Sequence, residues 1–140
     1  MRIKPPNLIG DGSHVHGAFT RRWLYCGWAM LALVVVFSLI PSPPQMDVQQ
    51  GDKLQHVFAY FALMLWFAQV FRQRHERFRL AIALIALGVG LEFLQGMTSW
   101  RSYDPVDMAA NAFGALLGWT AAPPRGPDLH ARLHALLVSE

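Results

Sequence analysis

The chain has 140 residues, of which 54% are hydrophobic and only 15% are charged, and its mean hydropathy is +0.27. This composition leaves too little polar surface for a soluble globular domain and favours a single integral membrane domain. The net charge of +3 does not indicate nucleic-acid binding, because the basic residues gather in short segments beside apolar runs, as in membrane proteins.

The N-terminal part of the chain combines a polar segment with the first long apolar run. Residues 1–22 form the N-terminal tail, in which residues 1–20 are polar and rich in glycine and proline, so we expect them to be loose, and two arginines follow. The following run, Trp23–Ile40, would be about 27 Å long as a helix, close to the hydrocarbon thickness of a bilayer. A secretory signal fits less well, because the run is long and residues 41–44 offer no A-x-A cleavage site. We therefore expect a first transmembrane helix that ends at prolines.

Three further apolar runs are long enough to cross a bilayer. They extend from about Leu54 to Phe71, from Leu80 to Met97 and from Val106 to Ala122. Pro105 precedes the last of them and suits the first turn of a helix. The sequence thus predicts an all-α fold, a polytopic membrane protein in which residues 23–122 form a bundle of four transmembrane helices.

The last residues of the chain, 123–140, follow the bundle as a tail that begins with two prolines. Within this tail, Asp128–Val138 places its leucines on one helical stripe, which is typical of a short amphipathic helix on a membrane surface. A frayed polar tail is the alternative that this pattern leaves open.

The distribution of positive charge predicts the orientation of the bundle. Both tails and the loop between the second and third spans contain most of the basic residues, which are Arg2, Lys4, Arg21, Arg22, Arg72, Arg74, Arg77, Arg79, Arg125 and Arg132. The two remaining loops contain only Lys53 and Arg101. By the positive-inside rule, both tails are cytoplasmic and the protein is a multi-pass protein of the inner, cytoplasmic membrane.

Polar residues gather at the opposite, outer ends of the last three spans, and helical spacing places those of each span on one face. Helix rise predicts a shallow and a deeper layer, which contain respectively His56, Gln95 and Asp107, and Tyr60, Glu92 and Asn111. Ala110, Gly114 and Gly118 continue the stripe of the fourth span and favour contact with another helix, because small residues allow close packing in lipid. Polar groups at membrane depth are costly, so a converging set of them predicts a functional site.

Three segments of the chain resemble the VanZ-like membrane proteins. They read D-K-L-Q-H-V-F-A-Y at 52–60, E-F-L-Q at 92–95 and R-S-Y-D-P-V-D-M-A-A-N-A-F-G at 101–114. The resemblance covers about residues 50–118. It implies a small multi-span protein of the bacterial cell envelope, in a family named for a protein that gives low-level resistance to the glycopeptide teicoplanin. The positions that match the family, and that we expect to bind a ligand, are Asp52, Lys53, His56, Tyr60, Glu92, Gln95, Arg101, Asp104, Asp107 and Asn111.

Three classes of function are compatible with this cluster. In the first, Lys53 and Arg101 hold a phosphate or carboxylate of a lipid-linked cell-wall precursor, a peptidoglycan stem or a lipid headgroup. In the second, a membrane enzyme uses acid–base chemistry on a lipid-linked substrate, with His56, Glu92 and Asp107 as catalytic candidates. In the third, the polar residues only hold the helices together, and Glu92 pairs with Lys53 or Arg101.

A divalent metal ion is a weaker interpretation of the same residues. The cluster contains carboxylates but only one histidine and no cysteine, so we expect no metal and no other cofactor. If a metal bound, carboxylate ligands would favour Mg²⁺ or Mn²⁺. The partners that we expect are therefore the lipid bilayer and a lipid-linked precursor, and no nucleic acid.

Overall fold

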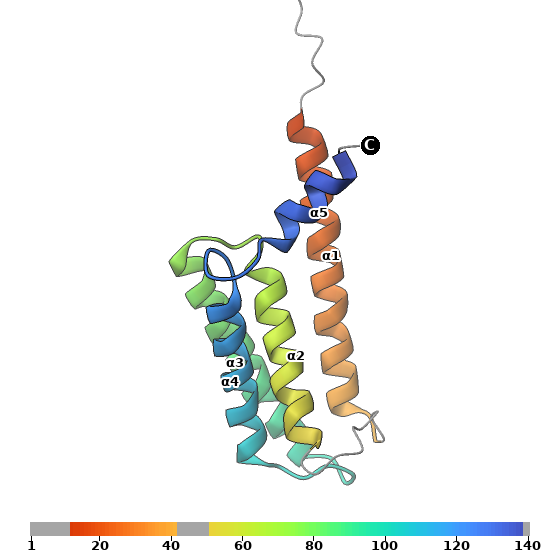
Figure 1. Cartoon of the computed structure of the whole chain (residues 1–140). Coiled ribbons are helices and arrows are strands. Elements are labelled where there is room, and N and C mark those ends of the chain that lie inside the picture. Colours follow the sequence, from red (N-terminus) through yellow and green to blue (C-terminus); the bar gives the residue numbers. More distant parts are fainter. Residues whose placement is uncertain (1–11, 42–50, 139–140) are drawn as a thin grey trace, which may run out of the picture.

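The computed structural model describes residues 12–41 and 51–138, which form five α-helices and no strand (Figure 1). The helices are α1 (Gly12–Leu39), α2 (Gly51–Phe67), α3 (Arg74–Gly96), α4 (Pro105–Ala121) and α5 (Leu129–Val138). The first four run up and down as a bundle, and α5 crosses the end of α1. The most extensive contact joins α2 to α4, while α1 lies at the edge of the bundle. The prediction of an all-α fold is confirmed.

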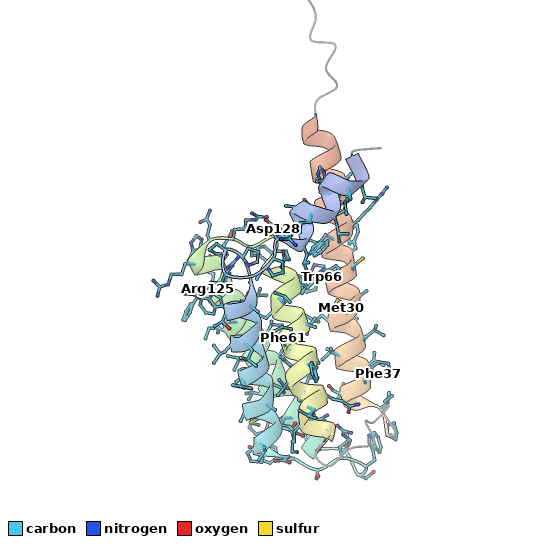
Figure 2. The ribbon with its side chains drawn as sticks, viewed as in Figure 1. Met30, Phe37, Phe61, Trp66, Arg125 and Asp128 are labelled. Carbon is cyan, nitrogen blue, oxygen red and sulfur yellow. The ribbon has the colours of Figure 1, made fainter. Side chains whose placement is uncertain are left out.

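Two of the described helical segments are long and apolar enough to cross a membrane, namely Gly17–Leu39 within α1 and the whole of α3. The helices α2 and α4 have 17 residues each. Large apolar side chains are exposed on every helix of the bundle, among them Trp28, Phe58, Phe93 and Phe113. Figure 2 shows Phe37 on the outside of α1. Exposed apolar side chains therefore lie on all four helices of the bundle.

The first helix begins earlier than the sequence predicted, because α1 starts at Gly12 instead of Trp23. The expected loose tail is thus wrong for residues 12–20, while residues 1–11 lie outside the described part of the chain. Part of this additional helix packs against α5: the ring of Phe19 lies 4.9 Å from that of His130 and 5.2 Å from that of His134. α5 also shows that the C-terminal segment is helical and not frayed.

Two tryptophans join α1 to α2. The rings of Trp23 and Trp66 stack with a centroid separation of 3.9 Å and an interplanar angle of 9°. Each indole N–H also donates to the main-chain carbonyl of the other residue, at 3.1 Å from Trp23 and 2.9 Å from Trp66. Gly27 permits this contact, because a Cβ atom there would lie 2.8 Å from the Trp66 side chain. Because glycine has no side chain, the two helices can approach closely at this point.

The contact between α2 and α4 depends on glycine. A Cβ atom on Gly114 would collide with the carbonyl of Val57, and one on Gly118 would lie 2.6 Å from the carbonyl oxygen of Phe61. The prediction that this stripe of small residues faces another helix is confirmed. Leu63 and Met64 of α2 are completely buried beside it, in the core of the bundle.

A buried arginine connects the ends of α2 and α4. The second helix ends at Phe67 and not at Phe71 as predicted, so the main-chain carbonyls that follow need other partners. Arg77 supplies them: Nε donates to the Phe71 oxygen and Nη2 to the Ala68 oxygen, both at 2.9 Å, and Nη1 donates to the Pro123 oxygen. The guanidinium therefore fixes the end of the bundle that carries most of the arginines.

The third helix also begins earlier than predicted, at Arg74 instead of Leu80. The Glu76 side chain accepts a hydrogen bond from the main-chain N–H of Gln73 at 3.0 Å, which caps the first turn. Hydropathy alone missed these residues, because the first two turns of α3 are charged. This difference lengthens the helix and places Arg77 within it.

Candidate functional site

Three helix ends meet at the end of the bundle opposite α5: the N-termini of α2 and α4 and the C-terminus of α3 (Figure 1). The start of α4 is well specified locally. Asp104 precedes the helix and accepts a hydrogen bond from the N–H of Val106 at 2.8 Å, and Pro105 occupies the first helical position. Polar residues in the first turns of α2 and α4 are thereby brought together.

Lys53 is the centre of an ion-pair network in this region. Its ammonium nitrogen lies 2.6 Å from Oδ1 of Asp107 and 3.0 Å from Oδ2 of Asp52, and it also binds Oδ2 of Asp104. The ammonium of Lys53, together with the N–H of Val106, holds the pKa of Asp104 below its usual range. Three carboxylates thus share one lysine, whose charge is fully compensated within the chain.

His56 lies one turn after Lys53 and contacts two residues of α4. Its Nδ1 is 2.9 Å from Oδ1 of Asn111, a distance typical of a hydrogen bond in which the ring N–H donates. Its Nε2 lies 3.5 Å from Oδ2 of Asp107. Asp107 and Asn111 are four residues apart and share a helix face, so both nitrogens of the ring face the same helix.

Glu92 and Tyr60 are the most deeply buried polar residues of the site, each with only 1% of its surface exposed. Oε1 of Glu92 accepts a hydrogen bond from the main-chain N–H of Asp104 at 2.5 Å. Its Oε2 and the hydroxyl of Tyr60 have no hydrogen-bond partner. A Cβ atom on Gly88 would lie 3.1 Å from that hydroxyl and 2.8 Å from Nδ2 of Asn111, so these polar groups meet over a glycine.

Most of the predicted site residues lie together in this region. They are Asp52, Lys53, His56, Tyr60, Glu92, Asp104, Asp107 and Asn111. The deeper layer is almost completely buried, as its depth in the predicted spans suggested. Their role in binding a ligand stays a prediction.

Two predicted residues do not join the others. Gln95 is buried, but its side-chain amide donates to the carbonyl of Ser38 at 2.7 Å and so ties α3 to the end of α1. Arg101 forms no ion pair with any residue in the described part of the chain, and Glu92 pairs with the Asp104 main chain instead of a cation. The sequence carried no signal for the contacts of Gln95 and Glu92, because both involve main-chain atoms of the partner residue.

The carboxylates of the site do not form a metal-binding set. Among residues 12–41 and 51–138, no three histidine, cysteine, aspartate or glutamate side chains are arranged to hold a metal ion. Lys53 lies between the aspartates, at the place where a cation would otherwise balance them. The ammonium group of Lys53 therefore supplies positive charge between these carboxylates.

Comparison with known proteins shows similarity to a protein whose function is not described. No protein-family model matches the chain, and no solved structure matches it. The chain is similar to the uncharacterized protein C11E3.10 of Schizosaccharomyces pombe, with 29% identity over 108 residues. The match covers 75% of this chain and 65% of the relative, so the chain spans only part of the length of that protein. A similar sequence therefore occurs in a yeast.

Proposed function

We propose that the chain is a four-span membrane protein with a VanZ-like arrangement of helices. The 17 residues of α2 or of α4 rise about 26 Å as a helix, which approaches the thickness of the hydrocarbon core. Their charged residues, Asp52, Lys53 and Asp107, are confined to the first turn of each helix. The apolar surface of all four helices supports lipid contact on every side of the bundle.

The arginines favour an orientation with both tails in the cytoplasm. The start of α1, the connection between α2 and α3, and α5 share one end of the bundle (Figure 1). That end carries most of the basic residues, and the opposite end carries only Lys53 and Arg101. In a bacterial inner membrane, the positive-inside rule would place the polar site at the outer leaflet.

We propose further that the polar site binds the headgroup of a lipid or of a lipid-linked cell-wall precursor. The observation that carries this proposal is the pair of buried groups without partners, Oε2 of Glu92 and the hydroxyl of Tyr60. Such groups are costly unless something satisfies them. Because Lys53 is already neutralised by three aspartates, recognition falls to these two groups. The Glu92 carboxylate can accept from hydroxyl or amine groups of the ligand, and the Tyr60 hydroxyl can donate or accept.

Two substitutions test ligand binding while the helix bundle stays folded. Glu92→Gln keeps the shape and an acceptor for the Asp104 N–H, and Asn111→Leu removes a polar partner of His56. Phe93→Leu, on an exposed face of the same helix, is the matched control. We expect the first two variants to lose glycopeptide tolerance in a teicoplanin-sensitive host while their abundance in the membrane stays near normal.

Abundance and tolerance should be measured side by side, together with the lipids that co-purify. A lipid that is retained by the wild-type protein and by Phe93→Leu, but not by Glu92→Gln, would identify the ligand class. Tolerance lost only in proportion to protein level would instead support a purely structural cluster. A wild-type protein that gives no tolerance would contradict the link to glycopeptides and leave the lipid experiment to decide on binding.

A membrane enzyme is the second candidate, favoured by the position of His56 between Asp107 and Asn111. A histidine oriented by a neighbouring side chain is a common general acid or base. The expected result is turnover of a lipid-linked substrate that His56→Gln abolishes. Incubation of the purified protein with labelled phospholipids, followed by analysis of released headgroups, checks it.

A further inference from the structure

A cleft opens at the arginine-rich end of the bundle, far from the polar site. It has a volume of about 320 Å³ and lies between the α2–α3 connection and the α4–α5 connection. Its lining residues are Arg72, Arg77, Pro123, Pro124, Gly126 and Asp128. This volume lies at the lower end of the range for small-ligand sites, roughly 300–1,000 Å³. Figure 2 shows Asp128 and the neighbouring Arg125 at this end.

Arg77 brings a buried positive charge to the wall of the cleft. The residue is only 6% exposed, and its three hydrogen bonds all end on main-chain carbonyls. No carboxylate of the described residues forms an ion pair with it. The carbonyl ends of α2 and α4 offset part of the charge, but a guanidinium has further N–H groups that these bonds do not use. The Arg77 guanidinium therefore gives the cleft a positive charge and unused N–H donors, both of which favour an anion.

Arg72 and Asp128 form the accessible side of the same cleft. Nη2 of Arg72 donates to Oδ2 of Asp128 at 2.6 Å, and the Arg72 side chain is about half exposed. Burial opposes the ionisation of Asp128, but the N–H of Ala131 and the Arg72 guanidinium outweigh it and keep the pKa of Asp128 below its usual range. The Asp128 carboxylate is thus an anion that already binds Arg72 in the cleft. With two arginines against one aspartate, the lining keeps a net positive charge.

We propose that this cleft binds a phosphate group, with Arg72 as the principal contact and Arg77 as the buried charge behind it. Planar guanidinium groups match phosphate oxygens in pairs, and basic pockets beside membrane helices suit anionic headgroups. The source of the phosphate is either an anionic phospholipid or a soluble phosphate compound. The proposal does not depend on any ligand at the opposite end of the bundle.

Three single substitutions test the cleft in the full-length protein. Arg72→Gln removes the accessible guanidinium. Asp128→Asn removes the competing carboxylate but keeps a good helix cap for α5, whose Ala131 N–H binds Oδ1 of Asp128 at 2.9 Å. Arg79→Gln removes an exposed cation of α3 that does not line the cleft, and is the matched control.

The protein is purified in an uncharged maltoside detergent, and its thermal unfolding midpoint is measured against inorganic phosphate and, separately, phosphatidate in mixed micelles, at constant ionic strength. We expect a saturable rise for the wild type. Arg72→Gln should weaken the apparent affinity about tenfold, since it removes a charge-assisted contact. Asp128→Asn should strengthen it, and Arg79→Gln should leave it unchanged.

The two probes distinguish the sources of the phosphate. Saturation by inorganic phosphate supports a soluble ligand, and saturation by phosphatidate alone supports a lipid headgroup. The proposal is overturned if neither probe gives a saturable shift, or if Arg79→Gln weakens binding as much as Arg72→Gln. The increase expected for Asp128→Asn guards against misfolding as an explanation, because a damaged protein would not bind more tightly.

Discussion

The ammonium nitrogen of Lys53 lies 2.6 Å from Oδ1 of Asp107, and this ion pair joins the first turn of α2 to the first turn of α4. Asp104, in the loop before α4, binds the same ammonium. This lysine therefore ties together the first turns of the two helices that have the most extensive contact in the bundle. The network thus has a structural role in joining α2 to α4.

Replacement of Lys53 by Gln should destabilise the bundle. The change leaves the carboxylates of Asp104 and Asp107 without their cation, and Asp107 is largely buried. We expect a loss of about 1–3 kcal/mol in the free energy of unfolding, because the Asp107 carboxylate loses the cation that pairs with it. Thermal unfolding in detergent measures it, with Arg79→Gln as the control for general loss of charge. Equal midpoints for the two variants would show that the network contributes nothing.

The same ion pair predicts a dependence of stability on pH. Lys53 holds the pKa of Asp104 below its ordinary value of 3.8, so the folded protein binds fewer protons there than the unfolded chain. The stabilisation is complete above pH 3.8 and is lost as the pH falls through the folded-state pKa. We expect the difference in unfolding midpoint between wild type and Lys53→Gln to narrow below this pH. A constant difference down to strong acid would exclude Asp104 as its source.

The sequence predicted the convergence of the polar residues better than it predicted the helix ends. Helical spacing and depth correctly gathered His56, Asp107 and Asn111, because three amphipathic faces in one bundle have few ways to bury polar groups. Hydropathy failed at the start of α3, where a charged turn continues the helix. It also failed at the start of α1, where Phe19 packs against α5.

Contacts to the main chain could not be predicted in the same way. Glu92 binds the N–H of Asp104, and Gln95 binds the carbonyl of Ser38. Main-chain groups are present at every residue, so no side-chain pattern marks the one that will serve as partner. For Glu92, a hydrogen bond to the backbone occurs in place of the ion pair with Lys53 or Arg101 that the sequence left open.

Gly114→Ala should destabilise the bundle far more than Gly90→Ala. A methyl group on Gly114 would collide with the Val57 carbonyl, whereas no atom lies within 4 Å of a Cβ on Gly90. Because a backbone carbonyl cannot rotate away, we expect Gly114→Ala to cost about 1–3 kcal/mol. Gly90→Ala should be neutral or stabilising by about 0.5–1 kcal/mol, since alanine favours helix. Unfolding curves of both variants check the difference, and similar midpoints would contradict the tight contact.

Reporter fusions test the four-span topology. The loop between α2 and α3 should be cytoplasmic because of its arginines, so a periplasm-dependent reporter fused at Gln73 should be inactive. The same reporter at Gln45, which lies outside the described residues, should be active. A cytoplasm-dependent reporter should give the opposite pattern. Activity of the periplasmic reporter at Gln73 and not at Gln45 would reverse the orientation, and equal activity at both would rule out a crossing between them.

Glu92 separates the structural role of the site from ligand binding most cleanly. Glu92→Leu leaves the N–H of Asp104 without an acceptor, so we expect a loss of about 1–3 kcal/mol in the free energy of unfolding. Glu92→Gln retains an acceptor oxygen and should stay close to wild type. Arg101→Gln should also have little effect, because Arg101 forms no ion pair within the described residues. Thermal unfolding of the three variants checks this order of stability. If Glu92→Gln unfolds as readily as Glu92→Leu, the negative charge itself is structural, and loss of function in Glu92→Gln could no longer be assigned to a ligand.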